Sequence, residues 1–193
     1  TLEDLDGLKM RVPGFAGEVL SKLGVVVTNI APGELYTALE RGTIDALEWV
    51  GPSLDLNMGF QKIAPYYYTG WHEPATELQF MVNKAAFDAL PAHLQKILTI
   101  AMQHAAYDMY ARSYHESAVN WASIEKEYPE VKIRTFSPEI IAAMKQVNQE
   151  LLEESAASDP TFKEILESQN AYMNMARKWT EISDYAYLKD NLE

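Results

Sequence analysis

Short apolar segments and short helical segments alternate through the first fifty residues, and this alternation constrains the fold more than any other feature. Residues 8–12, 25–28 and 44–47 are predicted to be strands. Residues 18–23 and 35–41 have helical spacing, and a glycine follows each of them. Such alternation favours parallel strands with helices packed on them, and ligands of such folds bind beyond the carboxyl ends of the strands.

Arg11 and Glu48 fall at the carboxyl ends of two of these predicted strands. Trp49 follows Glu48, and Gly51-Pro52 then breaks the chain direction. We therefore expect both charged side chains to reach the crevice beyond the strands. The alternative is a solvated strand end with an isolated Glu48 and a surface ion pair for Arg11, because exposed charges usually contribute little.

Composition limits the classes of partner. Sixteen Lys and Arg against 28 Asp and Glu give a net charge of −12, and a chain this acidic repels phosphate backbones and anionic membrane surfaces. We expect no nucleic-acid partner. The absence of cysteine excludes disulfides, zinc–thiolate sites and thiol nucleophiles. No apolar run approaches the roughly 20 residues of a membrane span, and the abrupt opening at Thr1 predicts that the true amino terminus lies upstream.

A loop with unusually many reactive side chains lies near the middle of the chain. The three tyrosines at 66–68 predict an extended segment, and the loop after Gly70 contains Trp71, His72 and Glu73. Binding residues are concentrated on such loops. We therefore take this loop as the second candidate source of site residues.

A long helix is predicted after this loop. Residues 78–82 are predicted to be an apolar strand, and Pro91 then opens a helix whose apolar positions continue to residue 127. At 1.5 Å per residue the helix would be about 54 Å long. It should therefore bridge two lobes.

Two further helices are predicted at the carboxyl end. Pro129 ends the long helix, and residues 131–136 are predicted to be a strand. Ser137 and Asp159, each followed by proline, are expected helix N-caps. The last helix has an apolar stripe that needs a cover, formed by Phe162, Ile165, Leu166, Tyr172, Met175, Trp179 and Ile182.

Four sequence motifs carry a family resemblance. They are EDLDGLKMRVP at 3–13, ALERGTIDA at 38–46, WVGP at 49–52 and YYYTGWHEP at 66–74. The first two resemble the solute-binding subunits of tripartite ATP-independent periplasmic (TRAP) transporters, and the last two resemble the branch that binds 2-oxo or 2-hydroxy monocarboxylates. The resemblance covers essentially the whole chain. It implies an α/β, periplasmic-binding-protein-like (type II-like) receptor of two lobes, with parallel-rich sheets flanked by helices.

The resemblance also implies roles for individual residues. Arg11 matches the arginine that pairs with the ligand carboxylate, a role that suits a rigid and permanently charged guanidinium. Metal-ligand positions fall on Glu48, on Trp49 through its main-chain oxygen, and on Glu73. Glu48, Trp49 and Trp71 are expected to line the substrate. For Trp71, packing in the core is an equally good interpretation.

Charge arithmetic also points to a cation. If Glu48, Glu73 and a substrate carboxylate converge, three negative charges face the positive charge of Arg11. Carboxylates in one closed crevice either take up a proton or recruit a cation. Oxygen ligands specify a hard ion, so we expect Na⁺, with Ca²⁺ as the alternative. Separate solvation of Glu48 and Glu73 is the other possibility.

The resemblance implies a division of the chain into lobes. Residues 1–76 and 117–162 would build the second ligand-binding lobe. Residues 77–116 would cross the hinge to complete the first lobe, most of which, including a Gln metal ligand, would lie upstream of Thr1. Residues 163–193 would form an arm that embraces a second subunit in a homodimer. Packing of this arm on its own lobe is the alternative.

The function that the resemblance implies is binding without catalysis. A periplasmic receptor would capture a small monocarboxylate, such as pyruvate, a longer 2-oxoacid or lactate, and deliver it to membrane permease subunits. A metal-assisted enzyme acting on 2-oxoacids through Glu48 and Glu73 is one alternative, although no nucleophile motif accompanies them. A helical dimerisation module without ligand is another. Turnover assays beside a binding titration test the enzyme, and the size of a chain without the last helix tests the module.

Overall fold

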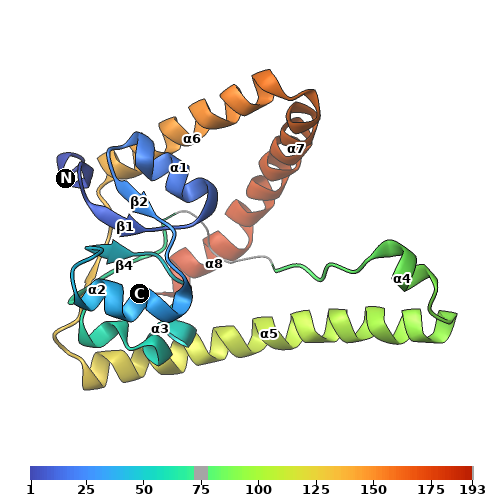
Figure 1. The fold of residues 1–193 in the computed structure, drawn as a ribbon, viewed down its shortest axis with the longest axis horizontal. Coiled ribbons are helices and arrows are strands. Elements are labelled where there is room, and N and C mark those ends of the chain that lie inside the picture. Colours follow the sequence, from blue (N-terminus) through green and yellow to red (C-terminus); the bar gives the residue numbers. More distant parts are fainter. Residues whose placement is uncertain (72–77, 193) are drawn as a thin grey trace. The chain divides into compact units, whose positions relative to one another are not determined.

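The computed structural model describes residues 1–71 and 78–192 of the chain (Figure 1). The chain divides into two compact units, Thr1–Ile141 and Ala142–Glu193. Among the described residues no helix is both long enough and apolar enough to cross a membrane.

The amino-terminal part forms a three-stranded parallel sheet. Its central strand is β1 (Lys9–Arg11), flanked by β2 (Val26–Thr28) and β3 (Ala46–Leu47). The connections contain α1 (Gly14–Lys22) and α2 (Leu35–Glu40). This arrangement confirms the strand and helix alternation predicted from the sequence. Because all three strands run in the same direction, their carboxyl ends lie at one edge of the sheet.

The core of this part is built from apolar side chains of the strands and helices. The most deeply buried are Val12, Leu20, Leu35 and Ile44. Close packing of α1 on the sheet depends on Gly17, since a Cβ atom there would lie 2.8 Å from the main-chain oxygen of Val12. Burial of large aliphatic side chains contributes roughly 1.5–3 kcal/mol each.

A second, two-stranded sheet pairs distant segments of the chain. Strand β4 (Tyr66–Tyr68) is parallel to β5 (Lys132–Arg134), which confirms an extended segment at both predicted places. Before β4, α3 (Pro52–Met58) packs on the carboxyl-terminal part of α5 (Ala92–Glu127). Gly59 has φ of 79° and separates α3 from the 3-10 turn η3 (Phe60–Lys62).

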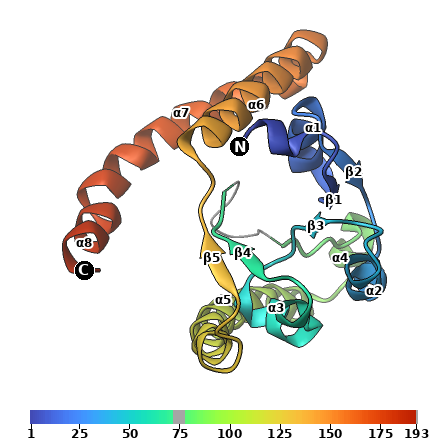
Figure 2. The same cartoon turned by 90° about the vertical axis from the view of Figure 1, so that its left-hand side faces the viewer.

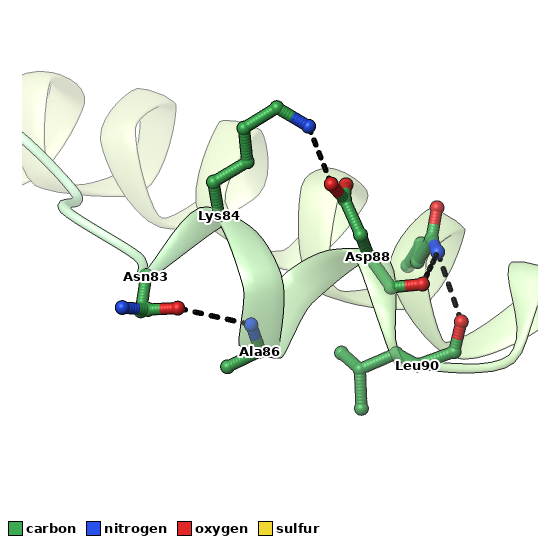
Figure 3. A network of polar contacts seen from close by, with 6 residues as sticks. Asn83, Lys84, Ala86, Asp88 and Leu90 are labelled. Carbon is green, nitrogen blue, oxygen red and sulfur yellow. Dashed lines mark hydrogen bonds and ion pairs between the residues drawn. The ribbon is translucent and has the colours of Figure 1, made fainter.

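The long helix predicted from Pro91 to residue 127 is present as α5, with Pro91 as its N-cap. Short helix α4 (Lys84–Asp88) precedes it (Figure 3). The Asn83 side chain accepts from the Ala86 N–H at 3.0 Å and caps α4. Gln95 Nε2 donates to the main-chain oxygen of Leu90 at 2.9 Å and closes the turn between the helices.

The strand predicted at 78–82 is wrong for this structure, because residues 78–83 have no regular secondary structure. A strand needs a neighbour to satisfy its main-chain hydrogen bonds. The apolar side chains of the segment remain exposed, among them Leu78, Phe80 and Met81. The sequence of residues 78–82 is therefore typical of a strand, but the described residues provide no neighbouring strand with which it pairs.

Helices make up the carboxyl-terminal part. Helix α6 (Pro138–Ser158) crosses from the first unit into the second, and Ser137 Oγ accepts from the Ile140 N–H at 3.3 Å. Asp159 accepts from the main-chain N–H groups of Thr161 and Phe162 and caps α7 (Pro160–Ile182). Both predicted caps are confirmed. After Ser183 the chain continues as α8 (Asp184–Asn191) (Figure 2).

Gly17→Ala should destabilise the full-length protein by about 1–3 kcal/mol, the usual cost of overpacking. Alanine is the better helix former by about 1 kcal/mol, but its methyl group would press on the Val12 oxygen and on Val27 Cγ1, 3.2 Å away. Gly33→Ala is the control, because a Cβ there would meet nothing within 4 Å among the described residues. Urea unfolding measures the free energy of unfolding of both variants and of the wild type. Equal stability of the two variants would contradict the close packing of α1.

Candidate ligand-binding site at the carboxyl ends of the parallel strands

Arg11 ends the central strand of the sheet, and its side chain is buried. The residue is 7% exposed. Its Nη1 donates to the main-chain oxygen of Glu48 at 2.8 Å, while the Glu48 N–H donates to the main-chain oxygen of Arg11 at 2.9 Å. The register of β1 with β3 therefore fixes the guanidinium against the loop that follows β3.

Glu48 and Trp49 supply further contacts to the guanidinium. Glu48 Oε2 lies 3.6 Å from Arg11 Nη1, and the Glu48 side chain is 16% exposed. Arg11 Cζ lies 5.3 Å from the centroid of the Trp49 ring, within the range of a cation–π interaction. The structure thus brings together three of the predicted site residues, from β1 and from the β3–α3 loop.

Several buried polar atoms at this place have no hydrogen-bond partner among the described residues. They are Arg11 Nε, Trp49 Nε1 and Thr28 Oγ1. Thr28 is the register partner of Arg11 on β2, so both residues stand at the same edge of the sheet. A buried donor left unsatisfied costs about 1–3 kcal/mol. An anionic ligand with two oxygens is the kind of molecule that would satisfy such donors.

Trp71 lies in an aromatic cluster next to β4. Its ring is 6.2 Å from the ring of Phe136 in an edge-on arrangement, and Phe136 stacks on Tyr68 at 4.7 Å. Packing explains these contacts without a ligand. A role of Trp71 in lining the substrate stays a prediction.

Glu73 and His72 lie outside the described residues. Within residues 1–71 and 78–192, no three His, Cys, Asp or Glu side chains come close enough together to hold a metal ion. Glu48 supplies one of the carboxylates expected of such a site, next to the Arg11 charge.

The sequence patterns did not single out Asp55 and Asn120. Together with Tyr67, one of the three tyrosines predicted to be extended, they form a hydrogen-bonded support for the β3–α3 loop. Tyr67 OH donates to Asp55 Oδ2 at 2.7 Å. Burial, and then the nearby Asp55 carboxylate, raise the pKa of the Tyr67 hydroxyl far above its usual value. Tyr67 therefore remains protonated and acts as a donor. The one signal in the sequence for Asp55 was its position four residues after Gly51, just beyond the Gly51-Pro52 turn.

Three solved structures resemble the chain closely. A TRAP periplasmic solute-binding protein from Colwellia psychrerythraea with bound calcium and pyruvate is 66% identical, with a TM-score of 0.96 over 98% of this chain and 58% of that one. Its counterpart from Pseudoalteromonas atlantica, with bound sodium and pyruvate, is 64% identical with a TM-score of 0.93, over 98% and 57%. A TRAP solute-binding protein from Bordetella bronchiseptica, a mixed-occupancy dimer with copurified calcium and picolinate, is 35% identical with a TM-score of 0.93, over 100% and 57%.

Sequence comparison agrees with the structural one. The monocarboxylate 2-oxoacid-binding periplasmic protein of Nostoc sp. is 37% identical over 97% of this chain and 51% of its own length. The chain thus spans about half the length of this curated relative. Residues 1–159 match the DctP model of bacterial extracellular solute-binding proteins, family 7, which are binding proteins of transporters and not enzymes. The chain therefore belongs to the DctP family of extracellular solute-binding proteins.

Proposed function

We propose that the protein containing this chain is the periplasmic solute-binding subunit of a TRAP transporter and that it captures a small 2-oxoacid, such as pyruvate, or lactate. The buried guanidinium of Arg11 carries this proposal, because it stands at the carboxyl end of a parallel strand with a free Nε among the described residues. The proposal agrees with the pyruvate bound by two similar proteins. We further propose that the protein delivers its ligand to membrane permease subunits, which is in keeping with its family.

The surroundings of Arg11 favour a ligand with one carboxylate. Arg11 is the one cation of the described site, and one of its nitrogens already bonds to Glu48. Beside it stand an indole ring and the acidic Glu48 side chain, which would repel a second acid group. A single carboxylate can pair with Arg11 while the remainder of a small ligand lies against Trp49.

A cation is the second element of the proposed site. Glu48 through its carboxylate, Trp49 through its main-chain oxygen and Glu73 would hold Na⁺, or alternatively Ca²⁺. The bound ion offsets the charge of these carboxylates and of the ligand and polarises the ligand's oxygens. Sodium and calcium each accompany pyruvate in a similar protein, which supports a hard cation without choosing between the two.

The part of the protein beyond this chain would supply the first lobe. We infer that residues 77–116 complete that lobe, whereas residues 1–76 and 117–162 form the second. Exposure of α5 supports this division, since Ile97 is 60% exposed and Tyr107 and Tyr114 are 73% and 74% exposed. Large exposed apolar and aromatic side chains of this kind mark a surface that contacts further protein.

A homodimer through residues 163–193 is the last element of the proposal. On α7, Ile165, Tyr172, Met175, Trp179 and Ile182 are all exposed. Their spacing of three, four and seven residues places them on one side of the helix. The similar protein from Bordetella bronchiseptica is a dimer. We therefore propose that a second copy of the chain packs against this side of α7.

Arg11→Ala in the full-length protein should weaken pyruvate binding by about 2–5 kcal/mol, the range for truncating one partner of a buried charge pair. Calorimetry with pyruvate, lactate and a longer 2-oxoacid measures the loss. Arg41→Ala is the matched control, because Arg41 is an exposed arginine that follows α2, away from the carboxyl ends of the strands. Unchanged affinity of Arg11→Ala for every acid that binds the wild type would rule out this site.

Glu48→Gln should weaken metal-dependent pyruvate binding about tenfold or more, because even supporting residues of metal ligands have effects of that size. The titration is run on the full-length protein with Na⁺, with Ca²⁺ and after removal of both ions. Asp45→Asn serves as the control, since Asp45 pairs with Lys9 near the start of β3. Binding that depends neither on the ions nor on Glu48 would show that no metal takes part.

Trp179→Ala should raise the dissociation constant of the dimer about thirtyfold, which corresponds to a loss of about 2 kcal/mol at a buried aromatic anchor. Light scattering of the full-length protein across micromolar concentrations measures the mass. Lys178→Ala changes the neighbouring exposed residue and should leave the dissociation constant of the dimer unchanged. A wild-type protein with the mass of a monomer at these concentrations would refute the dimer.

A further inference from the structure

The Asp55 carboxylate joins two segments that are separate in the chain. Its Oδ1 accepts from the main-chain N–H of Gly51 at 3.1 Å, and its Oδ2 accepts from the Tyr67 hydroxyl at 2.7 Å. Gly51 closes the loop that carries Glu48 and Trp49, whereas Tyr67 is the middle residue of β4. One side chain therefore fixes the loop after β3 relative to the second sheet.

Other contacts hold this support in place. Asn120 of α5 donates through Nδ2 to the main-chain oxygens of Pro52 at 2.9 Å and Ser53 at 3.3 Å. The Tyr67 ring lies 5.6 Å from the ring of Trp121, the next residue of α5. The start of α3 and the centre of β4 are thus both anchored to the carboxyl-terminal half of α5.

A helix cap alone does not account for this geometry. In a capping box, a side chain in the first turn of the helix accepts from the N-cap N–H, and that role requires only the bond that Asp55 accepts from Gly51. The second oxygen of Asp55 instead bonds to Tyr67, twelve residues away on another element. A neutral hydroxyl bonding to a carboxylate is among the stronger hydrogen bonds of a protein.

We propose that Asp55 and Tyr67 are positioning residues of the ligand site, which hold the 48–51 loop so that the Glu48 oxygen and the Trp49 ring stay against Arg11. The effect of Asp55 and Tyr67 on ligand affinity rests on the proposed function. Their effect on the position of the loop does not. Gly51 has φ of 148° and ψ of 178°, a backbone conformation that favours glycine, and the Asp55 carboxylate accepts from its N–H. Without the bond to Tyr67, the loop samples more positions and the buried guanidinium loses its fixed acceptor.

The test is a double-mutant cycle in the full-length protein. Tyr67→Phe removes one hydroxyl, Asp55→Ala removes both acceptors, and the double variant combines them. Tyr66→Phe is the matched control, because it removes the same hydroxyl from the exposed neighbour on β4. Hydrogen exchange of a peptide covering residues 46–53 is measured without ligand. Pyruvate affinity is measured by calorimetry, and the melting temperature reports general stability.

Tyr67→Phe should raise the exchange rate of residues 48–51 and weaken pyruvate binding, each about tenfold, as expected for loss of one hydrogen bond to a charged group. In the Asp55→Ala background it should have no further effect on either quantity. Tyr66→Phe should match the wild type.

Two outcomes would overturn the proposal. Unchanged exchange of residues 48–51 in Tyr67→Phe, even with a lower melting temperature, would mean that the bond stabilises the fold without positioning the loop. Faster exchange with unchanged pyruvate affinity would mean that the loop position does not matter for binding. If the wild-type protein binds no 2-oxoacid, the proposed function fails, and the exchange comparison still decides whether Asp55 and Tyr67 hold the loop.

Discussion

The buried guanidinium of Arg11 is the constraint on which the rest of the site depends. Removing a permanent charge from water costs several kcal/mol unless hydrogen bonds and an opposite charge offset the loss. The Glu48 main-chain oxygen, the Glu48 carboxylate and the Trp49 ring supply that offset together. All three come from one loop, so the parallel pairing of β1 with β3 and the position of this loop stabilise each other.

The alternation of strands and helices and the juxtaposition of Arg11 with Glu48 could be predicted because both depend on local patterns. Strands of two or three residues, α1, α2 and the long α5 follow from periodicity and from glycine or proline at their ends. Parallel strands then necessarily bring their carboxyl ends to one edge. The position of Arg11 and Glu48 at these strand ends is therefore enough to predict that they lie together, even when no side-chain contact is known.

The remaining features depend on contacts between distant segments, which a single sequence does not encode locally. Asp55 resembles any acidic residue in a first helical turn, and only the fold reveals Tyr67 as its second partner. The apolar run at 78–82 has a strand pattern, but the pattern carries no information on whether a neighbouring strand exists. The pairing of β4 with β5, more than sixty residues apart, was invisible for the same reason.

Helix α5 illustrates how far the stability of one element depends on the rest of the protein. Of its 36 residues, all of them within the described part of the chain, Ile124 is the buried one, and α3 packs near that end. Most helical stability in proteins comes from tertiary packing of one apolar face. In the amino-terminal two-thirds of α5, large apolar and aromatic side chains such as Ile97, Tyr107 and Tyr114 are exposed. Exposed side chains of this size are what a contact with further protein would cover, which supports our proposal that α5 serves two lobes.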